Sequence, residues 1–157
     1  MTARWVHGTA FEAEYPDRLV RRERKGWGSS FFMKPGTTNW FHIAIPTPAL
    51  IDGVRPLLSR IFVLYGASRG AGATFGSTLT DVHVYDGKNK VWGFDGERDG
   101  GHTGSIDSDN TFSIDPPLTI YSGLGISVCA ICPKGLPDEA GGYQVSFATV
   151  GADFTRP

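Results

Sequence analysis

The fold is decided by a segment in the middle of the chain, residues 79–94, with the sequence LTDVHVYDGKNKVWGF. In residues 79–85 the side chains alternate, so that Val82 and Val84 face one side and polar or aromatic residues face the other. This period of two is that of a half-buried β-strand. The pair Asp86-Gly87 follows, and residues 90–94 continue beyond it. An Asp-Gly turn between two such runs predicts a β-hairpin.

Further strand-like segments lie on both sides of this hairpin. Residues 39–45 alternate in the same way, and residues 61–65 form a continuous apolar run, as expected of a strand covered on both faces. The other candidates are residues 5–11, 27–33, 111–114, 118–121, 125–132 and 142–150. About eight to ten short strands separated by turn signals predict an all-β protein. We therefore expect a single antiparallel β-sandwich, resembling a jelly roll.

Helical periodicity is weak throughout the chain. Residues 17–25 are predicted to form a helix, with Asp17 as its N-cap and Gly26 as its stop. Leu19 and Val20 supply all of its apolar content, which leaves little to anchor it to a core. A single helical turn is predicted over residues 55–60.

The composition bounds the class of protein. The chain has 157 residues, of which 40% are hydrophobic, 21 are Gly and 10 are Pro. This length and apolar content suit one domain over residues 1–157, and the many Gly and Pro residues disfavour a helical bundle. Fifteen basic and 16 acidic residues give a net charge of −1. The sequence therefore offers no overall field that would attract nucleic acid or an anionic membrane.

The N-terminal sequence and the cysteines predict the compartment. The segment MTARWVHG lacks the apolar stretch of a signal peptide, and no apolar run approaches the ~18 residues of a membrane helix. Cys129 and Cys132 are too few for a disulfide-stapled secreted domain, and a zinc ribbon would need a second such pair. We expect a soluble, cytoplasmic protein with two ordinary thiols.

Tryptophan, histidine and acidic residues recur at a spacing of two. Trp5-Val6-His7 and Trp40-Phe41-His42 repeat the pattern Trp-x-His, and Asp81-Val82-His83 has a carboxylate in place of the Trp. Residues i and i+2 share a face of a strand, so neighbouring strands would gather these side chains on one face. Such a face can stack on a sugar ring and offer oriented hydrogen bonds. The predicted ligand-binding residues are Trp5, His7, Trp40, His42, Asp81, His83 and Tyr85.

This pattern predicts a non-enzymatic binding module without a cofactor, for a small molecule such as a carbohydrate. The alternative without a ligand is that the Trp residues pack in the core or at a subunit contact. A three-His metal site is a second alternative, although the close His-x-His pair of metal-binding jelly rolls is missing. A small enzyme with His83 as a base beside Asp81 is a third, although no Gly-x-Ser-x-Gly elbow is present. A self-assembling structural subunit that forms homo-oligomers is compatible with the apolar strands and low net charge.

An acidic loop is the second candidate site. Residues 95–100 (DGERDG) place carboxylates at i, i+2 and i+4 before a Gly, like the first half of a calcium loop. The twelfth position is Ile106, where that motif needs Glu. The predicted calcium ligands are Asp95, Glu97, Asp99, Asp107 and Asp109. The alternative is a solvated hairpin loop without an ion.

Overall fold

A computed structural model describes residues 1–68, 77–98, 100–101, 103–135 and 141–157. The strands of this described part are β1 (Thr2–His7), β2 (Glu12–Ala13), β3 (Leu19–Lys25), β4 (Gly28–Met33), β5 (Thr38–Ile45), β6 (Leu57–Ser68), β7 (Thr78–Asp86), β8 (Asn89–Arg98), β9 (Gly100–Gly101), β10 (Thr111–Thr119), β11 (Leu124–Ile131) and β12 (Tyr143–Thr155). Helical structure in the same part consists of two 3₁₀ turns, η1 (Gly8–Ala10) and η2 (Pro16–Arg18). No helix of the described residues has the length and apolar character that a membrane span requires.

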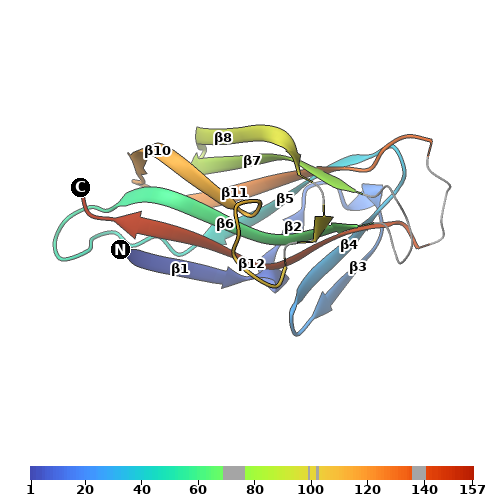
Figure 1. Ribbon diagram of the computed structural model, residues 1–157, viewed down its shortest axis with the longest axis horizontal. Helices are drawn as coiled ribbons and strands as arrows, with labels where there is room; N and C mark the ends of the chain where they lie inside the picture. Colours follow the sequence, from blue (N-terminus) through green and yellow to red (C-terminus); the bar gives the residue numbers. More distant parts are fainter. Residues whose placement is uncertain (69–76, 99, 102, 136–140) are drawn as a thin grey trace.

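The strands form two antiparallel sheets that pack face to face (Figure 1). Sheet A has the order β10-β6-β12-β4-β3, with β1 added on β12 and β9 on β6. Sheet B has the order β2-β5-β11-β7-β8. From β4 onward the chain alternates between the sheets with two exceptions: the β7–β8 hairpin stays in sheet B, and β9 and β10 both pair with β6 in sheet A. This winding of β4–β8 and β10–β12 is that of a jelly roll, so the predicted all-β jelly-roll sandwich is confirmed.

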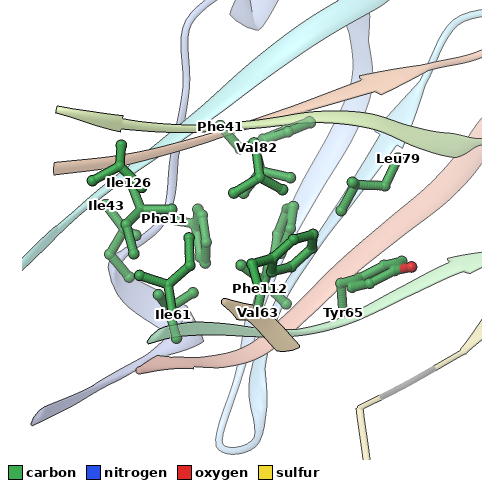
Figure 2. Packing of buried hydrophobic residues seen from close by; sticks show 14 of the residues in the cluster. Phe11, Phe41, Ile43, Ile61, Val63, Tyr65, Leu79, Val82, Phe112 and Ile126 are labelled. Carbon is green, nitrogen blue, oxygen red and sulfur yellow. The ribbon is translucent and has the colours of Figure 1, made fainter. Parts of the chain in front are cut away.

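The core lies between the two sheets (Figure 2). The alternation predicted from the sequence sets which side chains enter it. Buried side chains shown in Figure 2 come from β5, β7 and β11 on one side and from β6 and β10 on the other: Phe41, Ile43, Leu79, Val82, Ile126, Ile61, Val63, Tyr65 and Phe112. The ring of Phe11 stacks on that of Phe147 with their centroids 4.1 Å apart, and the ring centroids of Phe31 and Phe41 lie 4.6 Å apart. The predicted hairpin forms as β7 and β8, and it is longer than expected.

Strand β12 organises sheet A. On one side it pairs with β6 along most of its length. On the other side Tyr143–Phe147 pairs with β4, while residues 149–154 pair with β1. Gly8 and Gly28 lie where β1 and β4 meet this strand, and a Cβ on either glycine would overlap the carbonyl oxygen of Phe147. Two strands can therefore share one edge of β12 because both glycines lack a side chain.

The prediction of helix over residues 17–25 is wrong. The chain makes the 3₁₀ turn η2 and then continues as β3, the edge strand of sheet A. Arg22 and Arg24 both form ion pairs with Glu12 on β2, the edge strand of sheet B. Charged residues are common on edge strands because they discourage pairing with other chains. The helical turn predicted over residues 55–60 is also wrong, since β6 begins at Leu57.

Candidate functional site

The candidate site lies on the outer face of sheet B, and strand register brings its residues together. Across β5, β11 and β7, His42 is opposite Ser127, and Ser127 is opposite His83. In the next row Trp40 is opposite Cys129, and Cys129 is opposite Asp81. The alternating residues point into the core, so these side chains all point outward. We call this surface the sheet B face; its residues are Trp40, His42, Asp81, His83, Tyr85, Asp95, Ser127 and Cys129.

An aromatic cluster lies at the centre of the sheet B face. The rings of Trp40 and His83 lie 4.7 Å apart at an interplanar angle of 37°, and the rings of His83 and Tyr85 lie 6.5 Å apart. Trp40 and His83 come from strands on either side of β11, whose outward residues here are the small Ser127 and Cys129. These two side chains are only 7% and 3% exposed. The two rings therefore converge above β11, while Trp40, His83 and Tyr85 remain partly exposed.

His42 is fixed through both of its ring nitrogens. Its Nδ1 lies 2.8 Å from Ser127 Oγ, and its Nε2 lies 2.7 Å from Glu14 Oε2. Hydrogen bonds from Tyr15 and from His42 hold the pKa of Glu14 below its usual value. Glu14 is thus an ionised acceptor, and the imidazole cannot rotate without losing a partner.

The β7–β8 side of the face carries two carboxylates. Asp81 and Asp95 are opposite each other in the register of these strands. His83 Nε2 lies 3.4 Å from Asp95 Oδ1, and the ammonium group of Lys90 lies 2.8 Å from the same nitrogen. A hydrogen bond with Asp81 and another with His83 lower the pKa of Asp95. Beneath them, burial raises the pKa of the Cys129 thiol to about 11, and this neutral thiol hydrogen-bonds with Asp81.

A shallow hollow adjoins the sheet B face near Tyr85. It has a volume of about 420 Å³ and is open to solvent. Its lining consists mainly of small residues: Ala44, Ile45, Thr47, Gly87, Ser122, Gly123, Leu124 and Gly125. A Cβ on Gly125 would lie 3.7 Å from the Cβ of Tyr85, which places that glycine directly beside the tyrosine. The hollow therefore lies next to Tyr85, with no side chain at position 125 between them.

The structure separates two of the seven predicted ligand-binding residues from the other five. Trp40, His42, Asp81, His83 and Tyr85 share the sheet B face, whereas Trp5 and His7 lie on β1 of sheet A. Trp5 lies across Gly151 and stacks on Phe62 at 5.3 Å, with 42% of its surface exposed. His7 Nδ1 hydrogen-bonds with Thr9 at the start of η1. The expectation that all seven share one face fails because β1 does not join sheet B.

The predicted calcium ligands have different surroundings. Asp95 joins the sheet B face, Glu97 is exposed on β8, and Asp99 lies outside the described residues. Asp107 accepts hydrogen bonds from the backbone N–H groups of Asp109 and Asn110, which forms a turn. Asp109 lies 3.3 Å from Arg98. Within the described chain, the cluster of three ligand-type side chains is Asp81, His83 and Asp95 instead.

Several residues of the site did not stand out in the sequence. Glu14 and Tyr15 reach it from the segment that follows β2, and Lys90 reaches it from β8. Ser127 and Cys129 carried a usable signal, since they alternate with the buried Ile126 and Val128. Such polar or small residues on the outward side of a long strand mark a face that is exposed or covered by aromatic rings from neighbouring strands.

Three solved structures resemble the chain at low sequence identity. The C-terminal CBM6 of LamC, a marine laminarinase from Zobellia galactanivorans, is 8% identical, with a TM-score of 0.45, over 96% of this chain and 98% of that chain. The isomalto-dextranase of Arthrobacter globiformis T6, complexed with panose, is 12% identical, with a TM-score of 0.41, over 96% of this chain and 23% of that chain. The C-terminal domain of a chitobiase from Bacteroides fragilis is 12% identical, with a TM-score of 0.31, over 98% of this chain and 99% of that chain. Likenesses this low assign no ligand and no site residue.

Family membership is shown by the sequence itself. No curated protein matches the chain. The model of DUF6623, a family of unknown function, matches residues 1–155. The match spans nearly the whole chain, so the protein belongs to the DUF6623 family.

Proposed function

We propose that this protein is a binding module that holds a carbohydrate on the sheet B face. The observation that carries the proposal is the partly exposed Trp40 ring, whose centroid lies 4.7 Å from that of His83. A ring fixed in this way loses little side-chain entropy when a ligand stacks on it. Sugar rings present apolar C–H faces that pack on such aromatic surfaces.

The polar side chains around the cluster suit the hydroxyl groups of a sugar. Glu14, Asp81 and Asp95 supply carboxylate acceptors, and Lys90 supplies a donor. His42, which is hydrogen-bonded through both ring nitrogens, holds the Glu14 carboxylate in place beside the face. Pockets for small polar ligands combine an apolar surface with a few placed hydrogen-bonding groups, as this face does.

The extent of the face favours an oligosaccharide over a single sugar. Along β11, the row that contains Cys129 and Trp40 is four residues from Gly125, which lines the hollow. At about 3.3 Å per residue, this separation is about 13 Å. A short oligosaccharide can therefore contact Trp40 at one end and the hollow beside Tyr85 at the other.

The test is a glycan-array screen followed by calorimetric titration of each hit. Trp40→Ala is expected to weaken binding at least about tenfold, which corresponds to about 1.4 kcal/mol. Trp27→Ala is the matched control, because Trp27 is 44% exposed in the turn between β3 and β4, away from sheet B. Trp5→Ala tests the outer face of sheet A. An array without hits, or a Trp40→Ala variant that binds like the wild type, would refute the proposal.

A further inference from the structure

The β7–β8 edge of the sheet B face contains an arrangement that sugar binding does not explain. The ligand-type atoms of Asp81, His83 and Asp95 all lie within 4.8 Å of one another. Asp81 and Asp95 are directly opposed across the two strands. Like charges in directly opposed positions destabilise a sheet. The hydrogen bond between these two carboxyl groups needs a proton that offsets one charge, and a cation between them would serve the same purpose.

The protein already places one cation at this point. The Lys90 ammonium lies 2.8 Å from His83 Nε2, the same nitrogen that lies 3.4 Å from Asp95 Oδ1. Lys90 reaches this position by crossing Gly93, since a Cβ there would lie 2.9 Å from Lys90 Cε and 3.0 Å from its Nζ. Gly93 is opposite His83 in the register. One positive charge thus already lies beside His83 Nε2, the nitrogen that faces the Asp95 carboxylate.

We propose that Asp81, His83 and Asp95 form a binding site for a divalent first-row metal ion, with Zn²⁺ as the best fit, and that the metal displaces the Lys90 ammonium. One imidazole nitrogen and two carboxylate oxygens are ordinary Zn²⁺ ligands. Ca²⁺ and Mg²⁺ instead prefer sets of oxygen ligands only. The inference therefore differs from the calcium loop predicted from the sequence in both its ligands and its ion.

The geometry needs only a small adjustment. Ligand atoms around a tetrahedral Zn²⁺ with bonds of about 2.0–2.1 Å are separated by about 3.3 Å. The carboxylate of Asp95 can close this distance, because its side chain is 74% exposed. His83, with 14% of its side chain exposed, is held by the aromatic cluster, and Asp81 is held by the Cys129 thiol. Water would complete the coordination on the solvent side.

The site makes a prediction about Lys90 that an adventitious surface ion would not satisfy. Lys90 is a competitor of the metal, so Lys90→Met is expected to tighten Zn²⁺ binding about tenfold. Lys88→Met is the matched control, because Lys88 is an exposed lysine in the same β7–β8 turn. His83→Ala and Asp95→Asn each remove a ligand and are expected to weaken binding at least about tenfold.

The experiment is isothermal titration of the metal-free full chain with ZnCl₂, and separately with CaCl₂, without any glycan. One equivalent of Zn²⁺ that binds more tightly than Ca²⁺ is expected. Circular dichroism of each variant confirms that it is folded. A wild-type protein that does not bind Zn²⁺, a Lys90→Met variant that binds no more tightly, or binding that survives His83→Ala overturns the inference.

The inference does not rest on carbohydrate binding, and the two can fail separately. Trp40→Ala removes the proposed sugar platform but none of the three metal ligands. This variant loosens His83 but keeps all three ligands, so it is expected to weaken Zn²⁺ binding much less than His83→Ala does. A folded Trp40→Ala protein that binds Zn²⁺ no better than His83→Ala would contradict the assigned ligands. A glycan-array screen without hits would leave the Zn²⁺ titration unaffected.

Discussion

Asp86 ends β7 and ties the β7–β8 turn to the segment before β11. Its carboxylate is 9% exposed and accepts three backbone hydrogen bonds, from Tyr121 at 2.9 Å, Ser122 at 2.7 Å and Gly123 at 3.2 Å. Asp86→Asn keeps the shape but removes the charge and turns an N–H group toward donors. Hydrogen bonds to a charged group contribute about 1.5–3 kcal/mol to stability, and the amide oxygen of the Asn side chain retains part of this stabilisation. We expect the free energy of unfolding to fall by about 2 kcal/mol.

The effect of this substitution should depend on pH. Burial raises the pKa of Asp86, but the three N–H groups and the charge of Arg55 outweigh it and hold the pKa below its ordinary value. A carboxyl group with a lowered folded-state pKa stabilises the protein above its unfolded pKa, near 3.9. This stabilisation disappears as the pH falls through the folded-state pKa. The wild type should therefore exceed Asp86→Asn in stability from pH 5 to 8, and the difference should shrink below about pH 4.

Urea denaturation measures the difference at pH 7, and thermal melts follow it from pH 7 to pH 3. A loss of about 2 kcal/mol corresponds to a melting temperature lower by roughly 4–8 °C for a chain of this size. Asp17→Asn, an exposed aspartate in η2, is the control and should change neither quantity. A loss at pH 7 below about 0.5 kcal/mol, or a difference that grows as the pH falls, would refute the reasoning.

Two further predictions concern the junction on β12 and the buried thiols. Gly8→Ala should lower the free energy of unfolding, measured by urea denaturation, by at least about 2 kcal/mol, because its Cβ would overlap the Phe147 carbonyl. Gly26→Ala is the control and should be nearly neutral, because its Cβ would meet open space. Equal losses of stability in the two variants would contradict this. Cys129 and Cys132 should resist iodoacetamide at pH 7.5 in the folded protein and react in urea, because burial raises the pKa of both thiols. Rapid modification of the folded protein, detected by mass spectrometry, would contradict this prediction.

Local alternation explains how much of the fold could be predicted. Residues 39–45 and 82–85 carry a buried apolar side chain at every second position, and they lie in β5 and in β7, the first strand of the β7–β8 hairpin. The charged β3 has no such pattern, because an edge strand buries little of either face. Its pairing with β4 depends on tertiary context, and the helix propensity of residues 17–25 carries no information about that context.

The site was predicted in part for the same reason. A period of two places Asp81, His83 and Tyr85 on one side of β7 without any knowledge of the fold. Which strands become neighbours is a non-local property, and so the Trp-x-His of β1 lies in sheet A while that of β5 lies in sheet B. The role of Lys90 was hidden because it depends on the missing side chain of Gly93 on the same strand.

The position of β12 in sheet A also bears on how the protein is made. β12 is synthesised after every strand with which it pairs, and these are β1, β4 and β6. While residues 143–155 remain inside the ribosome, those three strands lack their common partner and expose unpaired edges. Contacts this distant in sequence also slow folding. We expect the sandwich to close only after residues 143–155 have left the ribosome, in one late step.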